Sequence, residues 1–166
     1  MQTLSRDEVS RYIDADPSAL YEVVADVTRT PELSPEIVSV EWLSGDGPVV
    51  GARFRARNKV AGRPGWWNTP EIVRAEPGRE FAFVRRERFG GDIVWSYRFT
   101  PEGDGTRVTE SYEVTRPVSK GLMFAIRYIY GRKDRIADVR AGMELSLERL
   151  AGLVGSSSGA ASRTQN

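Results

Sequence analysis

The chain has 166 residues, of which 40% are hydrophobic, and its 24 Lys and Arg against 23 Asp and Glu leave a net charge of +1. This length and composition suit one globular domain, and a charge so near zero argues against general attraction to nucleic acid or to an anionic membrane. Because the sequence contains neither Cys nor His, disulfides, cysteine nucleophiles, Ser-His-Asp triads and His-ligated zinc sites are excluded.

The N-terminal part of the chain predicts a strand, a helix and a short turn. Residues 9–14 alternate in polarity, which is typical of a strand, and Asp16-Pro17 is a helix-starting pair. Apolar residues then follow at helical spacing over residues 17–27, which predicts a helix with one buried face. Pro31 and Pro35 limit the next segment to a short helical turn.

Residues 37–114 predict a meander of antiparallel strands. Turn sequences rich in Gly, Pro and Asp, at 45–48, 62–65, 76–78, 90–91 and 102–105, divide this region into six strands. Aromatic residues fall repeatedly on one side of these strands. The pattern therefore predicts a curved sheet with an aromatic concave face.

The region after the sheet divides at Gly131. Residues 121–130 are apolar around most of a helical circumference, which predicts a short buried or lid-like helix. Beyond it, apolar residues step by 3, 4, 4 and 3 and predict one long helix with a stripe facing the sheet. That stripe consists of Ile136, Val139, Met143, Leu147 and Leu150. The small polar residues 155–166 predict a disordered tail, so we expect the domain to span residues 1–154.

The alternation of side chains along the strands predicts which residues face a cavity. We expect a four-residue loop at 101–104 to place Trp95 opposite Glu110, and a three-residue loop around 90–91 to place Arg85 opposite Tyr97. The candidate ligand-binding residues are Phe54, Asn58, Trp66, Phe83, Arg85, Trp95, Tyr97, Glu110, Tyr112, Phe124, Tyr128 and Met143.

These residues also have purely structural explanations. Glu110 and Arg85 could lie at the sheet margin and pair with neighbours, since an unpaired buried charge is costly. Single rings, and a Met within a helical stripe, are more often core residues than ligand contacts. Arg53, Arg55 and Arg57 alternate along one strand and could form a phosphate-binding stripe, but nearby acidic residues favour a solvated sheet face.

Motifs spread over about residues 7–153 point to a known superfamily. They are residues 13–17, Val24, Asp26, 51–54, Asn58, Trp66, 76–83, 95–99 and 105–111. Together with the order of elements, they resemble the START-like (SRPBCC) superfamily, also called the helix-grip or birch-pollen-allergen-like fold, and in particular its polyketide cyclase/dehydrase and lipid-transport branch. The resemblance implies an α+β fold in which a curved antiparallel sheet of about seven strands wraps around a long C-terminal helix. It also implies a cavity for a hydrophobic molecule.

Three functions remain open at this point. The first is non-catalytic binding of a small hydrophobic molecule such as a lipid or polyketide, which the ring-lined interior and the lack of His favour. The second is a polyketide aromatase/cyclase in which Arg85 would stabilise enolate charge, Glu110 or a Tyr would exchange protons, and Asn58 would assist. The third is a protein-interaction module with a filled core.

The sequence also supports expectations about partners and location. The first turns carry Arg6, Asp7 and Glu8 rather than an apolar leader, and no segment approaches the length of a membrane span. We therefore expect a cytoplasmic protein without integral membrane association. We expect no cofactor, metal or nucleic-acid partner. The oligomeric state cannot be predicted from these residues.

Overall fold

The computed structural model describes residues 5–45, 47–62, 64–87, 91–117, 121 and 135–161. Within these ranges, the strands are β1 (Arg6–Ile13), β2 (Ile37–Ser44), β3 (Arg53–Asn58), β4 (Trp66–Asn68), β5 (Glu71–Glu76), β6 (Glu80–Glu87), β7 (Gly91–Glu102) and β8 (Gly105–Arg116). The helices are α1 (Pro17–Ala25), the 3-10 helix η1 (Val27–Arg29), α2 (Thr30–Leu33) and α4 (Arg135–Ala161).

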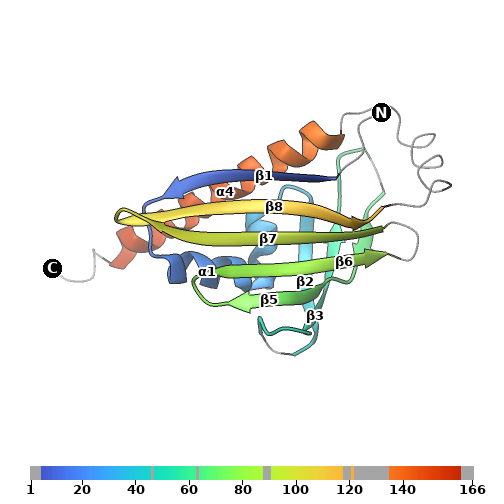
Figure 1. Ribbon diagram of the computed structural model, residues 1–166, viewed down its shortest axis with the longest axis horizontal. Coiled ribbons are helices and arrows are strands. Elements are labelled where there is room, and N and C mark those ends of the chain that lie inside the picture. Colours follow the sequence, from blue (N-terminus) through green and yellow to red (C-terminus); the bar gives the residue numbers. More distant parts are fainter. Residues whose placement is uncertain are drawn as a thin grey trace.

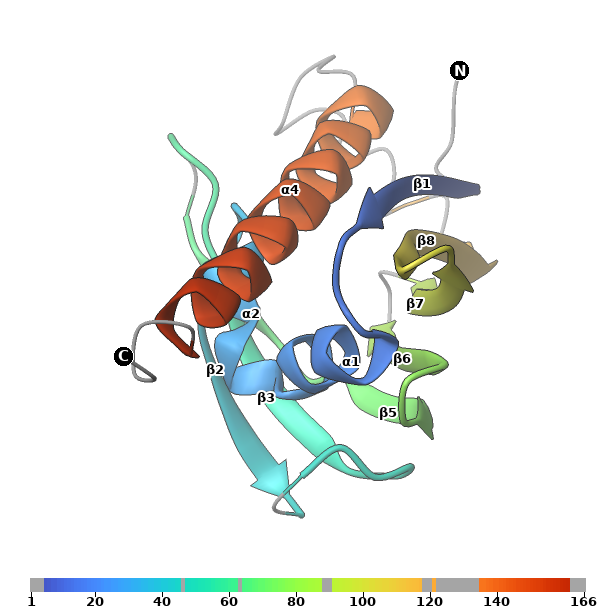
Figure 2. The same cartoon turned by 90° about the vertical axis from the view of Figure 1, so that its left-hand side faces the viewer.

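The strands form one curved antiparallel sheet in the order β1-β8-β7-β6-β5-β3-β2, and β4 pairs with β3 beside this path. Figure 1 shows the long neighbouring strands β1, β8, β7 and β6 side by side. Figure 2 shows the sheet curving around the side on which α1, α2 and α4 lie. This arrangement confirms the predicted α+β helix-grip fold, with a long C-terminal helix closing a curved sheet.

Local sequence explains where the first helix begins and ends. The Asp16 side chain accepts a hydrogen bond from the backbone N–H of Ser18 and so caps α1, and Pro17 occupies its first turn. The helix ends two residues earlier than predicted because Asp26 accepts a bond from the N–H of Thr28 and starts η1. Leu20 and Val24 are buried, as the spacing predicted.

The strand pairing differs from the predicted register by an even number of residues. Tyr97, not Trp95, lies opposite Glu110, because Glu102 pairs with Gly105 and the β7–β8 turn has two residues instead of four. Gly103 has a φ of 58° and Asp104 does not have a positive φ, which is the pattern of a type II′ turn with Gly first.

The register between β6 and β7 also differs from the prediction. Arg85 lies opposite Ile93, and Tyr97 lies opposite Phe81, because the strands pair up to Glu87 and Gly91. Both differences are even, and side chains alternate with a period of two along a strand. The residues predicted to face inward therefore still share the same face.

Helix α4 carries the predicted stripe and extends past the predicted domain boundary. Met143, Leu147 and Leu150 are buried, and Ile136 and Val139 are half-buried. The helix ends at Ala161, so residues 155–161 of the expected polar tail are helical. Alanine and serine in this segment are compatible with a helix. The predicted helix at residues 121–130 lies outside the described residues, apart from Gly121.

The outer face of β3 is solvated, as predicted. Arg53, Arg55 and Arg57 are exposed and alternate with buried residues. Arg55 forms an ion pair with Glu41, and its guanidinium lies 4.7 Å from the ring centroid of the exposed Trp67. These contacts neutralise and cover part of the arginine stripe, which favours a structural explanation for it.

Candidate functional site

A cavity of about 120 Å³ lies between the concave face of the sheet and the helices. Strands β2, β3, β4, β6, β7 and β8 supply one wall, and α1, η1, α2 and α4 supply the other. An engineered cavity of about 150 Å³ lined by apolar side chains binds benzene, whereas pockets for drug-sized ligands span about 300–1,000 Å³. In this structure the cavity therefore has room for a molecule of about one ring.

Most of the predicted site residues line this cavity. They are Phe54, Asn58, Phe83, Arg85, Trp95, Tyr97, Glu110 and Met143. Tyr112 is buried with its ring centroid 5.4 Å from that of Trp95, but it is not among the lining residues described. Trp66 is half-buried on β4 and is not among the lining residues described. Phe124 and Tyr128 lie outside the described residues.

The sheet side of the cavity is a wall of interlocked rings. Phe54 meets Phe83 edge to face with centroids 5.4 Å apart, and Phe81 lies 6.2 Å from Phe83. Trp42 packs edge to face on Phe54 from the neighbouring strand. Such pairs contribute about 0.5–1.5 kcal/mol each beyond the area they bury. The sheet side of the cavity is therefore an apolar surface stabilised by contacts between its own rings.

Glu110 is the most unusual polar group in this wall. It is only 3% exposed, and the Tyr97 hydroxyl donates a hydrogen bond to its Oε1 at 2.8 Å. Its Oε2 is buried and has no hydrogen-bond partner among the described residues. On the other side, Glu110 lies opposite Val9 of the edge strand β1. One carboxyl oxygen is thus fixed by the protein, and the other remains available to a ligand.

The surroundings of Glu110 favour its neutral form. The pKa of Glu110 is raised from 4.5 to about 8, because the effect of burial outweighs the lowering by the hydrogen bond from Tyr97. The pKa of Tyr97 is raised well above 10 by burial and then by the charge and hydrogen bond of Glu110. At neutral pH, Glu110 is therefore mainly a carboxylic acid, which both accepts and donates hydrogen bonds.

Further polar groups line the cavity on other strands. The Oδ1 atom of Asn68 is buried without a hydrogen-bond partner among the described residues. Asn58 is also buried, and its Nδ2 donates a long bond of 3.4 Å to the Ala56 carbonyl. The half-buried Arg85 brings a cation to the same cavity. The site therefore combines an apolar body with a few directional polar groups, as ligand pockets do.

The cavity reaches the surface where α4 passes over residues 34–36. Asp138 and Pro35 are both exposed, yet both line the cavity. A Cβ atom at Gly142 would lie 3.8 Å from the Pro35 Cγ atom. Gly142 therefore keeps side-chain bulk out of this opening.

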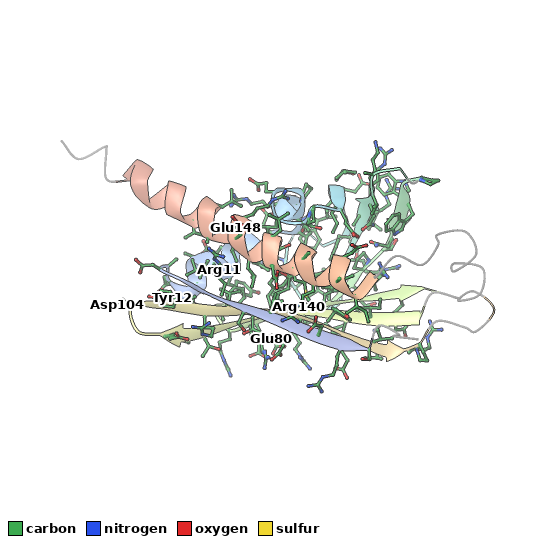
Figure 3. All side chains as sticks on the ribbon, turned by 90° about the horizontal axis from the view of Figure 1, so that it is seen from above. Arg11, Tyr12, Glu80, Asp104, Arg140 and Glu148 are labelled. Carbon is green, nitrogen blue, oxygen red and sulfur yellow. The ribbon has the colours of Figure 1, made fainter. Side chains whose placement is uncertain are left out.

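An ion pair helps to hold α4 in place over the sheet. The Nη1 atom of Arg140 lies 2.6 Å from the Oδ1 atom of Asp7 on β1, and Figure 3 shows Arg140 on the part of α4 that crosses this strand. Both side chains are partly exposed, so solvent weakens the pair and it contributes little to stability.

Sequence reasoning missed several polar residues of the cavity, among them Asn68 and Ser146. Asn68 was not among the candidate ligand-binding residues, although it lies two residues after the candidate Trp66 on β4 and so shares its face. Ser146 is buried and lines the cavity three residues after Met143. The apolar stripe of α4 did not include this Ser, although residues three apart share a helix face.

The described residues contain no cluster of three or more His, Cys, Asp or Glu side chains that could hold a metal ion. Among the same residues, no helix combines the length and apolar character needed to cross a membrane.

Comparisons with known proteins agree with this architecture. The family model described as "Polyketide cyclase / dehydrase and lipid transport" matches residues 6–155. The chain is also 30% identical over 106 residues to the granaticin polyketide synthase bifunctional cyclase/dehydratase of Streptomyces violaceoruber. This match covers 62% of the chain and 32% of that relative, so the chain spans about a third of its length.

Solved structures share the fold at low sequence identity. The di-domain ARO/CYC StfQ from the steffimycin biosynthetic pathway has a TM-score of 0.70 and 13% identity, with 93% of this chain and 52% of that chain covered. The major latex-like protein 151 of Panax ginseng has a TM-score of 0.68 and 15% identity, with coverage of 90% and 96%. The protein TTHA0849 of Thermus thermophilus has a TM-score of 0.66 and 22% identity, with coverage of 92% and 99%.

Proposed function

Because the chain belongs to the polyketide cyclase/dehydrase and lipid transport family, we propose that it binds a small hydrophobic molecule in the cavity between the sheet and α4. The observation that carries this proposal is the ring-lined wall with buried polar atoms that lack partners, namely Glu110 Oε2 and Asn68 Oδ1. Native structures rarely leave such atoms unsatisfied. A bound molecule with one or two polar groups would satisfy them.

The size of the cavity favours a ligand of about one ring. A volume of about 120 Å³ is small for a long polyketide chain or a sterol. A larger ligand would have to separate α4 from residues 34–36, where the cavity reaches the surface. The same volume argues against a completely filled core, so it favours ligand binding over a pure protein-interaction module.

A polyketide cyclase is the second candidate function, and the similarity to a bifunctional cyclase/dehydratase favours it. In this function the cavity would fold a reactive poly-ketone, and Arg85 would stabilise the negative charge of an enolate. Glu110, held by Tyr97, would give or take a proton. A pKa of about 8 suits a group that exchanges protons near neutral pH.

Native mass spectrometry can test the proposed function. The protein is incubated with a small-molecule extract of the cells in which it occurs, and any retained mass is identified. A hydrophobic adduct would support ligand binding, whereas a converted product in the extract would support the cyclase. The absence of both an adduct and a converted product would contradict both functions.

Two glycines of α4 provide a matched pair of variants for this experiment. In Gly142→Leu the new side chain points toward Pro35 and narrows the opening, so the adduct should be lost or form more slowly. In Gly152→Leu the new Cβ meets no atom within 4 Å, and binding should be unchanged. Equal adduct formation in both variants would show that the ligand does not enter past Gly142.

A further inference from the structure

Glu110 stands apart from the other polar groups of the cavity in how it is held. Its Oε1 atom is fixed by the Tyr97 hydroxyl at 2.8 Å, and its Oε2 atom is buried without a partner among the described residues. Both residues come from the β7–β8 hairpin, in which they are directly paired. The carboxyl group is therefore oriented before any ligand arrives, which lowers the entropy lost on binding.

We propose that Glu110 is the polar anchor of this cavity, and that its Oε2 atom donates a hydrogen bond to the carbonyl oxygen of an uncharged, single-ring ligand. The inference rests on the proposed function and adds the chemistry that the ligand must carry. As a carboxylic acid, Glu110 accepts the Tyr97 hydrogen at Oε1 and keeps its own proton on Oε2. A carbonyl oxygen offers the matching acceptor, whereas a carboxylate would lose its hydration on entering this largely apolar site, which is costly.

The charged and titratable groups facing the cavity are consistent with this role. Those described are Tyr97 on β7, Arg85 on β6, Glu36 before β2 and Asp138 on α4. Directly across the sheet, β1 presents the apolar Val9 to Glu110. Met143 and Ser146 of α4 are uncharged. Burial is the cause of the rise in the pKa of Glu110 to about 8, and the Tyr97 hydrogen bond opposes it.

This geometry makes ligand affinity depend on pH. When Glu110 loses its proton, Oε2 becomes an acceptor and repels a carbonyl oxygen. If only the neutral form binds, the apparent affinity falls in proportion to the neutral fraction. With a pKa of about 8, binding should be nearly constant below pH 7 and about tenfold weaker at pH 9.

Three probes of similar shape test the proposal: acetophenone, which carries a ketone oxygen, α-methylstyrene, in which a CH2 group replaces that oxygen, and benzoate, which carries a charge. Dissociation constants are measured by ligand-observed NMR titration of the full chain between pH 6 and pH 9. Acetophenone should bind more tightly at pH 6 than at higher pH, and its affinity should be about tenfold lower at pH 9. The affinity of α-methylstyrene should not change with pH, and benzoate should bind weakest.

Glu110→Gln separates the roles of charge and hydrogen bonding. The amide retains an acceptor for Tyr97 and a donor for the ligand but cannot titrate. Acetophenone should therefore bind this variant with an affinity independent of pH. Binding of α-methylstyrene to the same variant provides the control for an intact cavity.

The outcomes distinguish this inference from the proposed function. Equal, pH-independent binding of acetophenone and α-methylstyrene would overturn the role of Glu110 but leave hydrophobic ligand binding supported. Tighter binding of benzoate than of acetophenone would also overturn the inference, because it would assign ligand recognition to a cation. Failure of all three probes to bind would contradict both proposals.

Discussion

Replacing Glu110 with Gln should remove most of the change in stability between pH 5 and pH 8. In the folded protein, burial raises the pKa of Glu110 to about 8, compared with an ordinary value of 4.5. The folded state therefore binds more protons than the unfolded state between these two values. The stability that neutral Glu110 contributes is fully present below about pH 4.5 and is lost as the pH rises through 8.

The expected magnitude follows from the difference in pKa between the two states. A change from 4.5 to about 8, at about 1.4 kcal/mol for each pH unit, corresponds to about 5 kcal/mol. This is a large part of the 5–15 kcal/mol that stabilises a typical domain.

The sequence contains no His or Cys, whose ordinary pKa values lie closest to the range between about pH 5 and pH 8. The pKa values of the ion-paired Glu32, Asp92 and Glu102 are lowered, so these groups titrate at lower pH.

Urea unfolding at pH 5, 6, 7 and 8 measures this effect directly. The free energy of unfolding of the wild-type protein should fall by several kcal/mol over this range, and that of Glu110→Gln should stay nearly constant. The variant should therefore be the more stable protein at pH 8. Glu113→Gln, an exposed position on the same strand, serves as the control and should follow the wild type. Parallel curves for wild type and Glu110→Gln would refute a buried, neutral Glu110.

Two further substitutions test the packing and the hydrogen bond described above. A Cβ atom at Gly105 would lie 2.5 Å from the Ile13 carbonyl oxygen, so Gly105→Ala should lower the free energy of unfolding in urea by about 2 kcal/mol or more. Gly152→Ala, with open space at its Cβ, should instead leave it unchanged or raise it by up to about 1 kcal/mol. Tyr97→Phe removes the bond that lowers the pKa of Glu110, so the NMR titration midpoint of the Glu110 carboxyl carbon should move to higher pH; a downward movement would contradict the assigned pair.

The faces of the strands could be predicted from the sequence, but their register could not. Alternation placed Glu110 and Tyr97 on the same face, because this pattern depends only on the period of a strand. Their direct pairing depends on a two-residue turn at Gly103. Several loop lengths are compatible with the sequence around this Gly, and each gives a different partner for Glu110.

The inner wall of the cavity was harder to predict than the sheet. Met143 was found through the apolar stripe of α4, but Ser146 was not counted in that stripe because it is polar, although it shares the same helix face. Pro35 reaches the cavity only because residues 34–36 pack near Gly142 of α4. Contacts of this kind join segments that are far apart in sequence and depend on how the helix crosses the sheet. Local patterns contain no information about that crossing.

The position of Glu110 between a local and a distant strand has a consequence for folding. Its partner Tyr97 is joined to it by a short hairpin, whereas β1 pairs with β8 over a long separation, as Ser10 and Thr109 are 99 residues apart. Closing such a loop costs about 3 kcal/mol more chain entropy than closing a loop of a few residues. We therefore expect the hairpin to form early and β1 to join it late. The carboxyl group of Glu110 is thus enclosed only when β1 pairs with β8.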